Sequence, residues 1–433
     1  MVRHPLTDRA KFVDDHLEMI FDSAKNPLTG KQWWKAADEP WQCLAACTEL
    51  EAALSSGDPQ AFVSPFPVQQ DGSCNGLQHY AALGRDVGGA TKVNLAPSDR
   101  PQDIYAAVAN LVNEKIEKDS ALGLPIALKL RGKINRKIIK QPVMTNVYGV
   151  TPFGARAQIQ ERLKEFNVVP KEDYMEARKY LANEVFTSLK TLFIKARMIQ
   201  DWLTLAAEEI SRSVPADVAV HFGYKPELEV AVDAGGNVPG EKYRIPIPNQ
   251  NSLDPFITRY PQTSVSWDTP LGFRVVQPYL KTRMVHLKTV IQTLSLRSSD
   301  KLDPVDIGKQ VSAFPPNFVH SLDATHMFMT AMACFEAGIT FASVHDCFWT
   351  HAATVDQMNV KIREQFVSLY SQPVLQSLRS DFLQFYGSYK VPIKVPLDEG
   401  KYAAKWRHIN IPPVPEQGDF DIRQVLGSQY FFS

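Results

Sequence analysis

The stretch Asp71-Gly-Ser-Cys-Asn-Gly-Leu-Gln-His-Tyr80 decides how this chain is expected to fold. The preceding residues, Phe62 to Gln70, predict a strand that prolines interrupt, and the Gly, Ser and Asn that follow Asp71 are typical of a turn. A helix is expected from Leu77 to Leu83. The carboxylate of Asp71 should therefore lie at the end of a rigid strand, where a ligand can reach it.

Farther along the chain, Arg136-Lys-Ile-Ile-Lys140-Gln-Pro-Val-Met-Thr-Asn-Val-Tyr148-Gly149 combines cations with an aromatic residue. On a helix, Arg136 and Lys140 share a face, and Tyr148 is displaced from Lys140 by roughly 80°. All three can line one side of a groove, where the cations would hold a triphosphate and the ring would stack on a base or sugar. The alternative is a basic amphipathic helix that ends in a packed tyrosine and a glycine cap.

Pro142 lies inside this expected helix. A proline there removes one hydrogen bond and clashes with the preceding turn, at a cost of about 3 kcal/mol or more. Either the helix is kinked between Lys140 and Tyr148, or a new helical segment begins near Pro142. We expect a kink that leaves Lys140 and Tyr148 facing the same side.

A third stretch places Asp346 at a tight turn. Phe341 to Val344 predicts a short strand, and Phe348 to Thr350 can run back beside it. Magnesium takes oxygen ligands, commonly one or two carboxylates plus substrate phosphates, so Asp71 and Asp346 are candidate ligands of a pair of ions. The alternative is two ordinary turn aspartates, since nothing in the spacing shows that they meet.

The charge distribution is uneven. The 433 residues carry a formal net charge of +0, which taken alone argues against a nucleic-acid partner. Residues 120–160, however, contain no Asp or Glu, and their cations are Lys129, Arg131, Lys133, Arg136, Lys137, Lys140 and Arg156. This segment predicts a surface that faces phosphates, and a solvated helix face is the alternative. No apolar run approaches the roughly 18 residues that span a bilayer, so no membrane insertion is expected.

Helical periodicity predicts further helices at residues 8–24, 40–55, 100–118, 126–148, 155–212 (with a break near 168–170) and 321–337, the last ended by Gly338. Residues 213–262 hold seven prolines and the turn Gly235-Gly236-Asn237, and we expect an irregular surface insertion there. Residues 284–296 partly alternate, which suggests a strand or one arm of a hairpin. Helix is expected to about Tyr386 and loops from there to the end.

Together, the three stretches resemble motifs A, B and C of the phage-type single-subunit DNA-dependent RNA polymerases, in the same order and spacing. Motif A begins at Asp71, motif B at Arg136 and motif C at Val344. The block Pro316-Asn-Phe-Val-His320-Ser-Leu-Asp323 is also similar to this family, and the ending Tyr430-Phe-Phe-Ser433 looks like its mitochondrial branch. The resemblance runs from about residue 9 to residue 433, outside the 213–262 insertion.

The resemblance implies the catalytic roles. Asp71 and Asp346 match the ligands of two catalytic Mg²⁺ ions, together with the backbone carbonyl of Gly72. Lys140 matches the lysine that contacts the incoming triphosphate and can protonate pyrophosphate. Arg136 matches a second phosphate contact.

Further roles concern the nucleotide sugar and the nucleic acid. Tyr148 matches the tyrosine that favours ribose over deoxyribose. His320 matches a histidine near the nucleotide sugar, whereas a hydrogen-bonded core histidine would be favoured without the resemblance. Tyr105 and Phe153 match aromatic residues near the template, and residues 284–296 correspond to a hairpin that reads promoter DNA.

The implied fold is helix-rich α+β, a right-hand polymerase with palm and fingers. Residues 1–87 correspond to an incomplete palm with motif A, residues 88–320 to the fingers, and residues 321–433 to the return to the palm with motif C. The implied partners are a DNA template, an RNA transcript, ribonucleoside triphosphates and a mitochondrial transcription initiation factor. The implied location is the mitochondrial matrix, although the acidic N-terminal residues are wrong for a presequence.

Family members carry more chain before the point that matches Met1, namely an N-terminal region, a thumb and the first palm strands. We therefore expect a fragment, a truncated gene or a decayed copy. Two alternative functions follow: a non-catalytic nucleic-acid-binding remnant, and a DNA polymerase of the related right-hand family. Gly72-Ser73 and His320 argue against the DNA polymerase.

Overall fold

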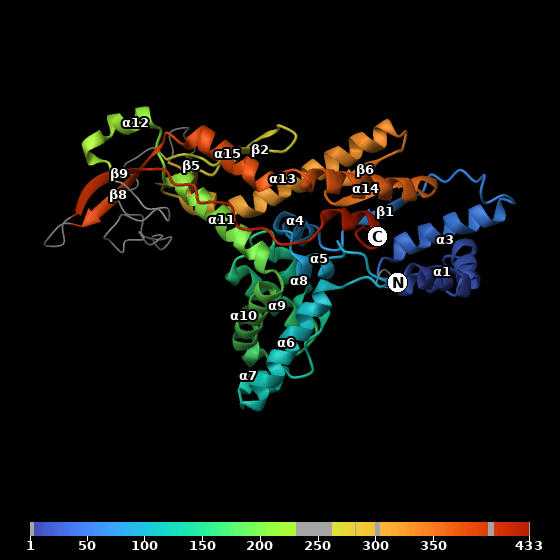
Figure 1. Ribbon diagram of the computed structural model, residues 1–433. Coiled ribbons are helices and arrows are strands. Elements are labelled where there is room, and N and C mark those ends of the chain that lie inside the picture. Colours follow the sequence, from blue (N-terminus) through green and yellow to red (C-terminus); the bar gives the residue numbers. More distant parts are fainter. Residues whose placement is uncertain (1–3, 231–261, 282, 299–303, 397–401, 433) are drawn as a thin grey trace.

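The computed structural model describes residues 4–230, 262–281, 283–298, 304–396 and 402–432, and its architecture is helix-rich α+β (Figure 1). At one end lie α1 (Leu6–Asp15), α2 (Leu17–Lys25) and α3 (Pro40–Ser55). A column that projects from the body contains α6 (Ile104–Ala121), α7 (Pro125–Leu130), α8 (Arg136–Asn146), α9 (Pro152–Glu165) and α10 (Tyr174–Leu192). The body is built on α11 (Ile194–Arg212), α13 (Ile307–Glu336), α14 (Val355–Tyr370) and α15 (Val374–Tyr386).

A small antiparallel sheet joins distant parts of the chain. Its strand order is β1 (Pro67–Asp71), β7 (Cys347–His351) and β6 (Ala342–Val344). The register sets Asp71 opposite Cys347, and residues directly opposite each other in an antiparallel pair present their side chains on the same face. After β1 come α4 (Asn75–Gly84), whose residues are all buried, and α5 (Val87–Lys92). The predicted strands therefore form, with the first starting only at Pro67.

Helix α13 is much longer than the predicted helix 321–337. It begins at Ile307, where the Asp306 side chain accepts a hydrogen bond from the Lys309 amide at 3.1 Å, and it runs through Pro315 and Pro316. Phe314 and Phe318, which flank the prolines, are buried, so tertiary packing outweighs the local cost of the two rings. The predicted end at Gly338 is confirmed, because its left-handed φ of 69° lets the helix close in a Schellman motif.

Several predicted helices divide in ways that local capping explains. Residues 8–24 form two helices with a break at His16. Residues 126–148 form α7 and α8, because Gly132 adopts a left-handed φ of 68° and the Asn135 side chain caps the new helix. Residues 155–212 form three helices, and helix 100–118 starts only at Ile104, which Asp103 caps. Residues 40–55 form one helix, as predicted.

The loop expected after residue 386 is wrong. Residues there form a hairpin of β8 (Lys390–Pro396) and β9 (Tyr402–His408), which packs with α12 (Ala216–His221). Val214, Ala219 and Trp406 form a second small core, so the start of the expected irregular insertion is ordered by the C-terminal hairpin. The Gly235-Gly236-Asn237 turn lies outside the described residues. Within the described part, no helix is both long and apolar enough to cross a bilayer.

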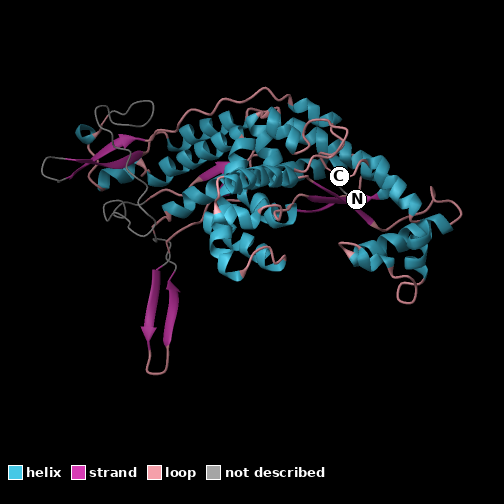
Figure 2. Ribbon diagram, turned by 90° about the horizontal axis from the view of Figure 1, so that it is seen from below, coloured by secondary structure: helices cyan, strands magenta, loops and turns pink. Residues whose placement is uncertain are grey.

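The predicted hairpin near residues 284–296 is present. β4 (Arg283–Lys288) and β5 (Thr293–Ser298) pair antiparallel and project from the body (Figure 2). Val290 and Ile291 at its tip are almost fully exposed. The shorter hairpin of β2 (Ser266–Asp268) and β3 (Arg274–Val276) instead packs on the body, where Trp267 is completely buried.

Candidate active site

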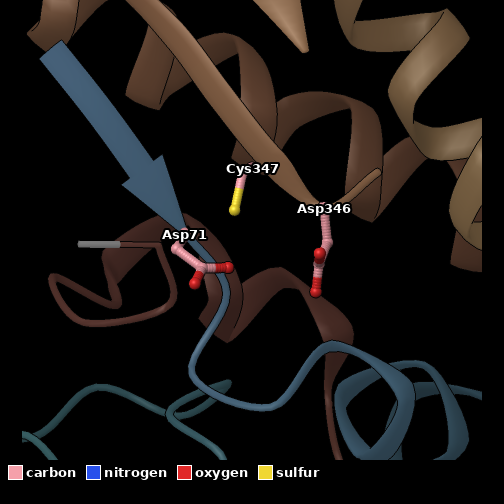
Figure 3. Close-up of side chains that lie close together, drawn as sticks. All are labelled: Asp71, Asp346 and Cys347. Carbon is pink, nitrogen blue, oxygen red and sulfur yellow. The ribbon is translucent and has the colours of Figure 1, made fainter. Parts of the chain in front are cut away.

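The carboxylates of Asp71 and Asp346 come together at the ends of paired strands (Figure 3). One oxygen of each and the sulfur of Cys347 lie within 4.8 Å of one another. Asp71 ends β1, whereas Asp346 lies in the two-residue turn between β6 and β7. The sheet therefore brings the first and third sequence motifs to one point.

The residue beside each aspartate has a constrained backbone position. His345, beside Asp346, has a left-handed φ of 52°, which turns the chain within two residues. At Gly72, beside Asp71, a Cβ would stand 2.8 Å from Oε1 of Gln78, a buried side chain that two backbone carbonyls hold in place. Any residue larger than glycine would have to displace Gln78. The motif's Asp-Gly pair is thus explained by close packing beneath the carboxylate.

Burial and neighbouring negative charge raise the proton affinity of both carboxylates. Burial raises the pKa of Asp71 to about 6, and repulsion from Asp346 adds to this shift. Burial also raises the pKa of Asp346, with repulsion from Asp323. Lys140 acts in the opposite direction on the pKa of Asp71. A cation bound nearby would lower both pKa values and so favour the ionised pair.

These residues fit magnesium. Mg²⁺ prefers oxygen ligands and usually takes only one or two protein carboxylates, leaving positions for water and phosphate oxygens. Asp71 and Asp346 offer two convergent, solvent-accessible carboxylates on rigid backbone. The neighbouring thiol of Cys347 accepts a hydrogen bond from Gln69 Nε2 at 3.3 Å, and burial raises its pKa to about 11, so it stays neutral near these carboxylates.

Helix α8 presents the cations of the second motif. It runs unbroken from Arg136 to Asn146 with Pro142 inside it, which rules out a second helix starting at Pro142. Lys140 is exposed, and none of the described carboxylates forms an ion pair with it. The Lys140 charge lowers the pKa of Asp71, whereas burial raises the pKa of Tyr148, with repulsion from Asp346 and more weakly from Asp71. The kink that would leave Lys140 and Tyr148 facing the same side stays a prediction.

Arg136 and Tyr105 form a separate pair. The Arg136 guanidinium donates to the Asp103 carboxylate at 2.7 Å and lies 4.9 Å from the centre of the Tyr105 ring. Tyr105 is only 7% exposed, so little of its ring is free to stack on a base. Phe153, at the start of α9, is 76% exposed and remains free to do so.

Tyr148 is fixed by the end of its helix. The Val150 and Gly149 amides donate to the carbonyls of Thr145 and Asn146, each at 3.1 Å, in a Schellman motif. Gly149 has a left-handed φ of 77°, and a Cβ there would lie 3.2 Å from Pro316 of α13. The ring centroid of Tyr148 is 4.5 Å from that of His320, so the structure brings these two predicted residues together.

The basic segment is partly neutralised. Lys129 pairs with Asp173, Arg131 with Glu117 and Arg136 with Asp103, each at 2.7 Å. Those acids come from segments outside residues 120–160. The unbalanced charge that the sequence shows is therefore smaller in the fold, and Lys140 is the cation that faces the carboxylates.

Sequence reasoning missed a buried polar network beneath the site. Asn75 Nδ2 donates to Asp323 Oδ1 at 2.6 Å, and His79 Nε2 lies 3.7 Å from the same oxygen. His79 Nδ1 also contacts the Tyr370 hydroxyl, and His326 lies nearby with a ring centroid separation of 6.1 Å from His79. The available signal was the clustering of polar residues on one face of two apolar helices.

Acid should destabilise the fold through His326. Its Nε2 donates to the Ile362 carbonyl at 2.9 Å, and Nδ1 is buried without a partner, so a second proton would create an unpaired cation. Burial, with repulsion from His79, lowers the pKa of His326 to about 4. Because the unfolded chain protonates first, near pH 6.5, stability present above that pH is lost as pH falls toward 4.

Because His326 binds its second proton more readily in the unfolded chain, the free energy of unfolding should fall by about 2 kcal/mol between pH 7.5 and pH 5. Urea unfolding at both values would measure it. His326→Gln can still donate to the Ile362 carbonyl but does not titrate, so its loss over the same interval should be smaller by that amount. Parallel losses in the two proteins would contradict the assignment.

Comparisons with known proteins agree with the motifs. The sequence profile of the DNA-dependent RNA polymerase family matches residues 1–433. The chain is 42% identical over 431 residues to "DNA-directed RNA polymerase, mitochondrial" of Schizosaccharomyces pombe, which covers 98% of this chain and 34% of that protein. Its identity to the protein of the same name in Homo sapiens is 42%, covering 100% and 31%. For "DNA-directed RNA polymerase 1B, mitochondrial" of Nicotiana tabacum, identity is 41%, covering 98% and 36%.

This chain spans about a third of the length of these relatives. The match is nevertheless continuous across the chain, and it includes the three motifs whose carboxylates and aromatic residues meet in the fold. The chain therefore belongs to the family of phage-type DNA-dependent RNA polymerases.

Proposed function

We propose that this chain is the catalytic region of a DNA-directed RNA polymerase, which adds ribonucleotides to an RNA 3′ end on a DNA template. The observation that carries the proposal is the convergence of Asp71 and Asp346, whose oxygens lie within 4.8 Å although the residues are far apart in the sequence. Two carboxylates on rigid backbone are what two-metal nucleotidyl transfer requires.

In this proposal, Asp71, Asp346 and the carbonyl of Gly72 hold the two magnesium ions. Bound ions would supply Lewis-acid stabilisation of the attacking and leaving oxygens. Lys140, exposed on the same side, would bind the triphosphate and give a proton to the leaving pyrophosphate. Arg136 is a second phosphate contact, although Asp103 holds it in the structure described here.

The domain assignment extends the same proposal. The sheet β1-β7-β6 with both aspartates corresponds to the palm, in residues 1–87 and 321–433. The helical column that includes α8 corresponds to the fingers, in residues 88–320. The projecting hairpin β4–β5 would contact promoter DNA, and exposed Phe153 would stack near the template, with Tyr105 behind it.

Location and partners follow from the relatives. Those compared above are named mitochondrial polymerases, so we propose that this protein acts in the mitochondrion. Its partners would be a DNA template, the RNA transcript, ribonucleoside triphosphates and a mitochondrial transcription initiation factor.

Templated extension of an RNA primer tests the proposed reaction. The purified protein should extend the primer on DNA with Mg²⁺ and ribonucleotides, adding the base complementary to each template position. Omission of the template or chelation of Mg²⁺ should stop extension. Binding of the RNA–DNA hybrid without any extension would instead support the non-catalytic nucleic-acid-binding alternative.

Tyr148→Phe should relax sugar selection. The variant keeps the ring beside His320 but loses the hydroxyl, whose hydrogen bond we assign to recognition of ribose. Loss of one such bond is worth about 1.4 kcal/mol, so the preference for ribo- over deoxyribonucleotides should fall about ten-fold. Steady-state kcat/KM for each nucleotide measures the preference, and an unchanged ratio would remove Tyr148 from this role.

A further inference from the structure

We propose that Asp323 is a positioning residue for sugar selection, acting through His320 and Tyr148. The inference rests on the function proposed above and assigns to it a residue outside the pair of candidate metal ligands. Three helix contacts carry it: α4 to α13, α13 to the end of α8, and the end of α8 back to α4.

The contact between α4 and α13 is a short hydrogen bond. Asn75 Nδ2, on the first residue of α4, donates to Asp323 Oδ1 at 2.6 Å. Asn75 is buried and the Asp323 side chain is only 17% exposed, so the bond forms largely away from water. Asn75 follows Asp71 by only four residues, so the bond ties α13 to the segment that carries the first carboxylate.

The contacts of Tyr148 complete the ring. Asp323 lies one turn after His320 on α13, and the His320 ring is 4.5 Å from the Tyr148 ring. Gly76 of α4 also lies against this ring, since a Cβ there would be in van der Waals contact with it, 3.4 Å from Tyr148 Cε1. Tyr148 therefore fits between α4 and α13, and the width of that gap depends on how the two helices are joined.

In this proposal, the bond between Asn75 and Asp323 holds α4 and α13 at their present separation. Gly76 and Asn75 are neighbours on α4, and His320 and Asp323 are one turn apart on α13, so the bond lies beside the aromatic contact. Truncating Asp323 would leave the Asn75 amide without its acceptor in a buried position, which disfavours the present spacing of the helices. A wider gap would allow the Tyr148 ring to tilt away from the position that distinguishes the two sugars.

Asp323→Ala is expected to lower the ribose preference of the purified protein about ten-fold, while the dissociation constant for an RNA–DNA hybrid stays within two-fold. Asp323→Asn keeps an oxygen that can accept from Asn75, so it should restore most of the preference. Glu336→Ala, an exposed acid at the end of the same helix, serves as the matched control and should leave the preference unchanged.

A double variant and a second single variant separate positioning from general destabilisation. Asp323→Ala added to Tyr148→Phe should cause little further loss of preference, because both act through the same ring. Asn75→Ala should reproduce the effect of Asp323→Ala, and it tests the bond even if the aspartate variant does not fold. Full additivity with Tyr148→Phe, or a wild-type preference in both Asp323→Ala and Asn75→Ala, would overturn the proposal.

The wild-type protein in the same assay distinguishes this proposal from the proposed function. A wild-type protein that does not extend the primer contradicts the polymerase activity itself. A wild-type protein that extends with ribose preference, beside an Asp323→Ala variant with the same preference, contradicts only the positioning role.

Discussion

Asp346→Asn is expected to reduce templated RNA extension by at least about a thousand-fold, or about 4 kcal/mol of transition-state stabilisation. The amide keeps the size of the side chain but loses the charge that, with Asp71, would bind magnesium. The fold should not suffer, because burial and repulsion raise the pKa of both carboxylates and removal of one charge relieves that repulsion. We therefore expect an unchanged or higher melting temperature together with lost activity.

A metal-dependent thermal shift separates binding from chemistry in this experiment. Mg²⁺ should raise the melting temperature of the wild type and have less effect on Asp346→Asn, since a ligand that binds only the folded state stabilises it. Asp356→Asn, in the exposed first turn of α14, is the matched control and should extend RNA normally. Substantial extension by Asp346→Asn would refute the two-carboxylate site.

The two aspartates could be singled out from the sequence as candidate metal ligands, but their meeting in the fold could not be predicted from local patterns. Asp71 could be recognised because turn residues follow it at the end of a predicted strand, and Asp346 because it lies in a tight turn between two predicted strands. Their meeting depends on the pairing of β1 with β7, which sets Asp71 opposite Cys347, and no local pattern encodes a pairing between such distant segments. Only the resemblance to the polymerase motifs suggested that Asp71 and Asp346 meet. The register of β1 on β7 gives the physical reason why they do.

Elements whose signals are local were predicted best. The helix at residues 40–55 and the glycine stop at Gly338 follow from periodicity and capping. The start of α13 was missed because Pro315-Pro316 is a strong local break, and only burial against other helices overrides it. The hairpin β8–β9 was missed because its order comes from packing of Trp406 against Val214 and Ala219, far away in the chain.

Trp267→Ala should lower the free energy of unfolding by about 3–5 kcal/mol, more than any other substitution proposed for this protein. The indole is completely buried on β2, with ring centroids 5.1 Å from Phe314 and 6.4 Å from Phe318 of α13. Its Nε1 donates to Ser321 Oγ at 3.0 Å. Truncation would leave a cavity against the helix that carries His320, and urea unfolding followed by circular dichroism would measure the loss.

Phe273→Ala is the matched control, because this aromatic residue joins β2 and β3 but is 73% exposed, so its loss should cost less than about 0.5 kcal/mol. Trp267→Phe should fall between the two, since it keeps an aromatic ring but loses the bond to Ser321. Equal stability of Trp267→Ala and Phe273→Ala would mean that β2–β3 does not anchor α13.

If β2–β3 does anchor α13, Trp267→Ala should also weaken the ribose preference at temperatures below its unfolding transition, because α13 positions His320 against Tyr148.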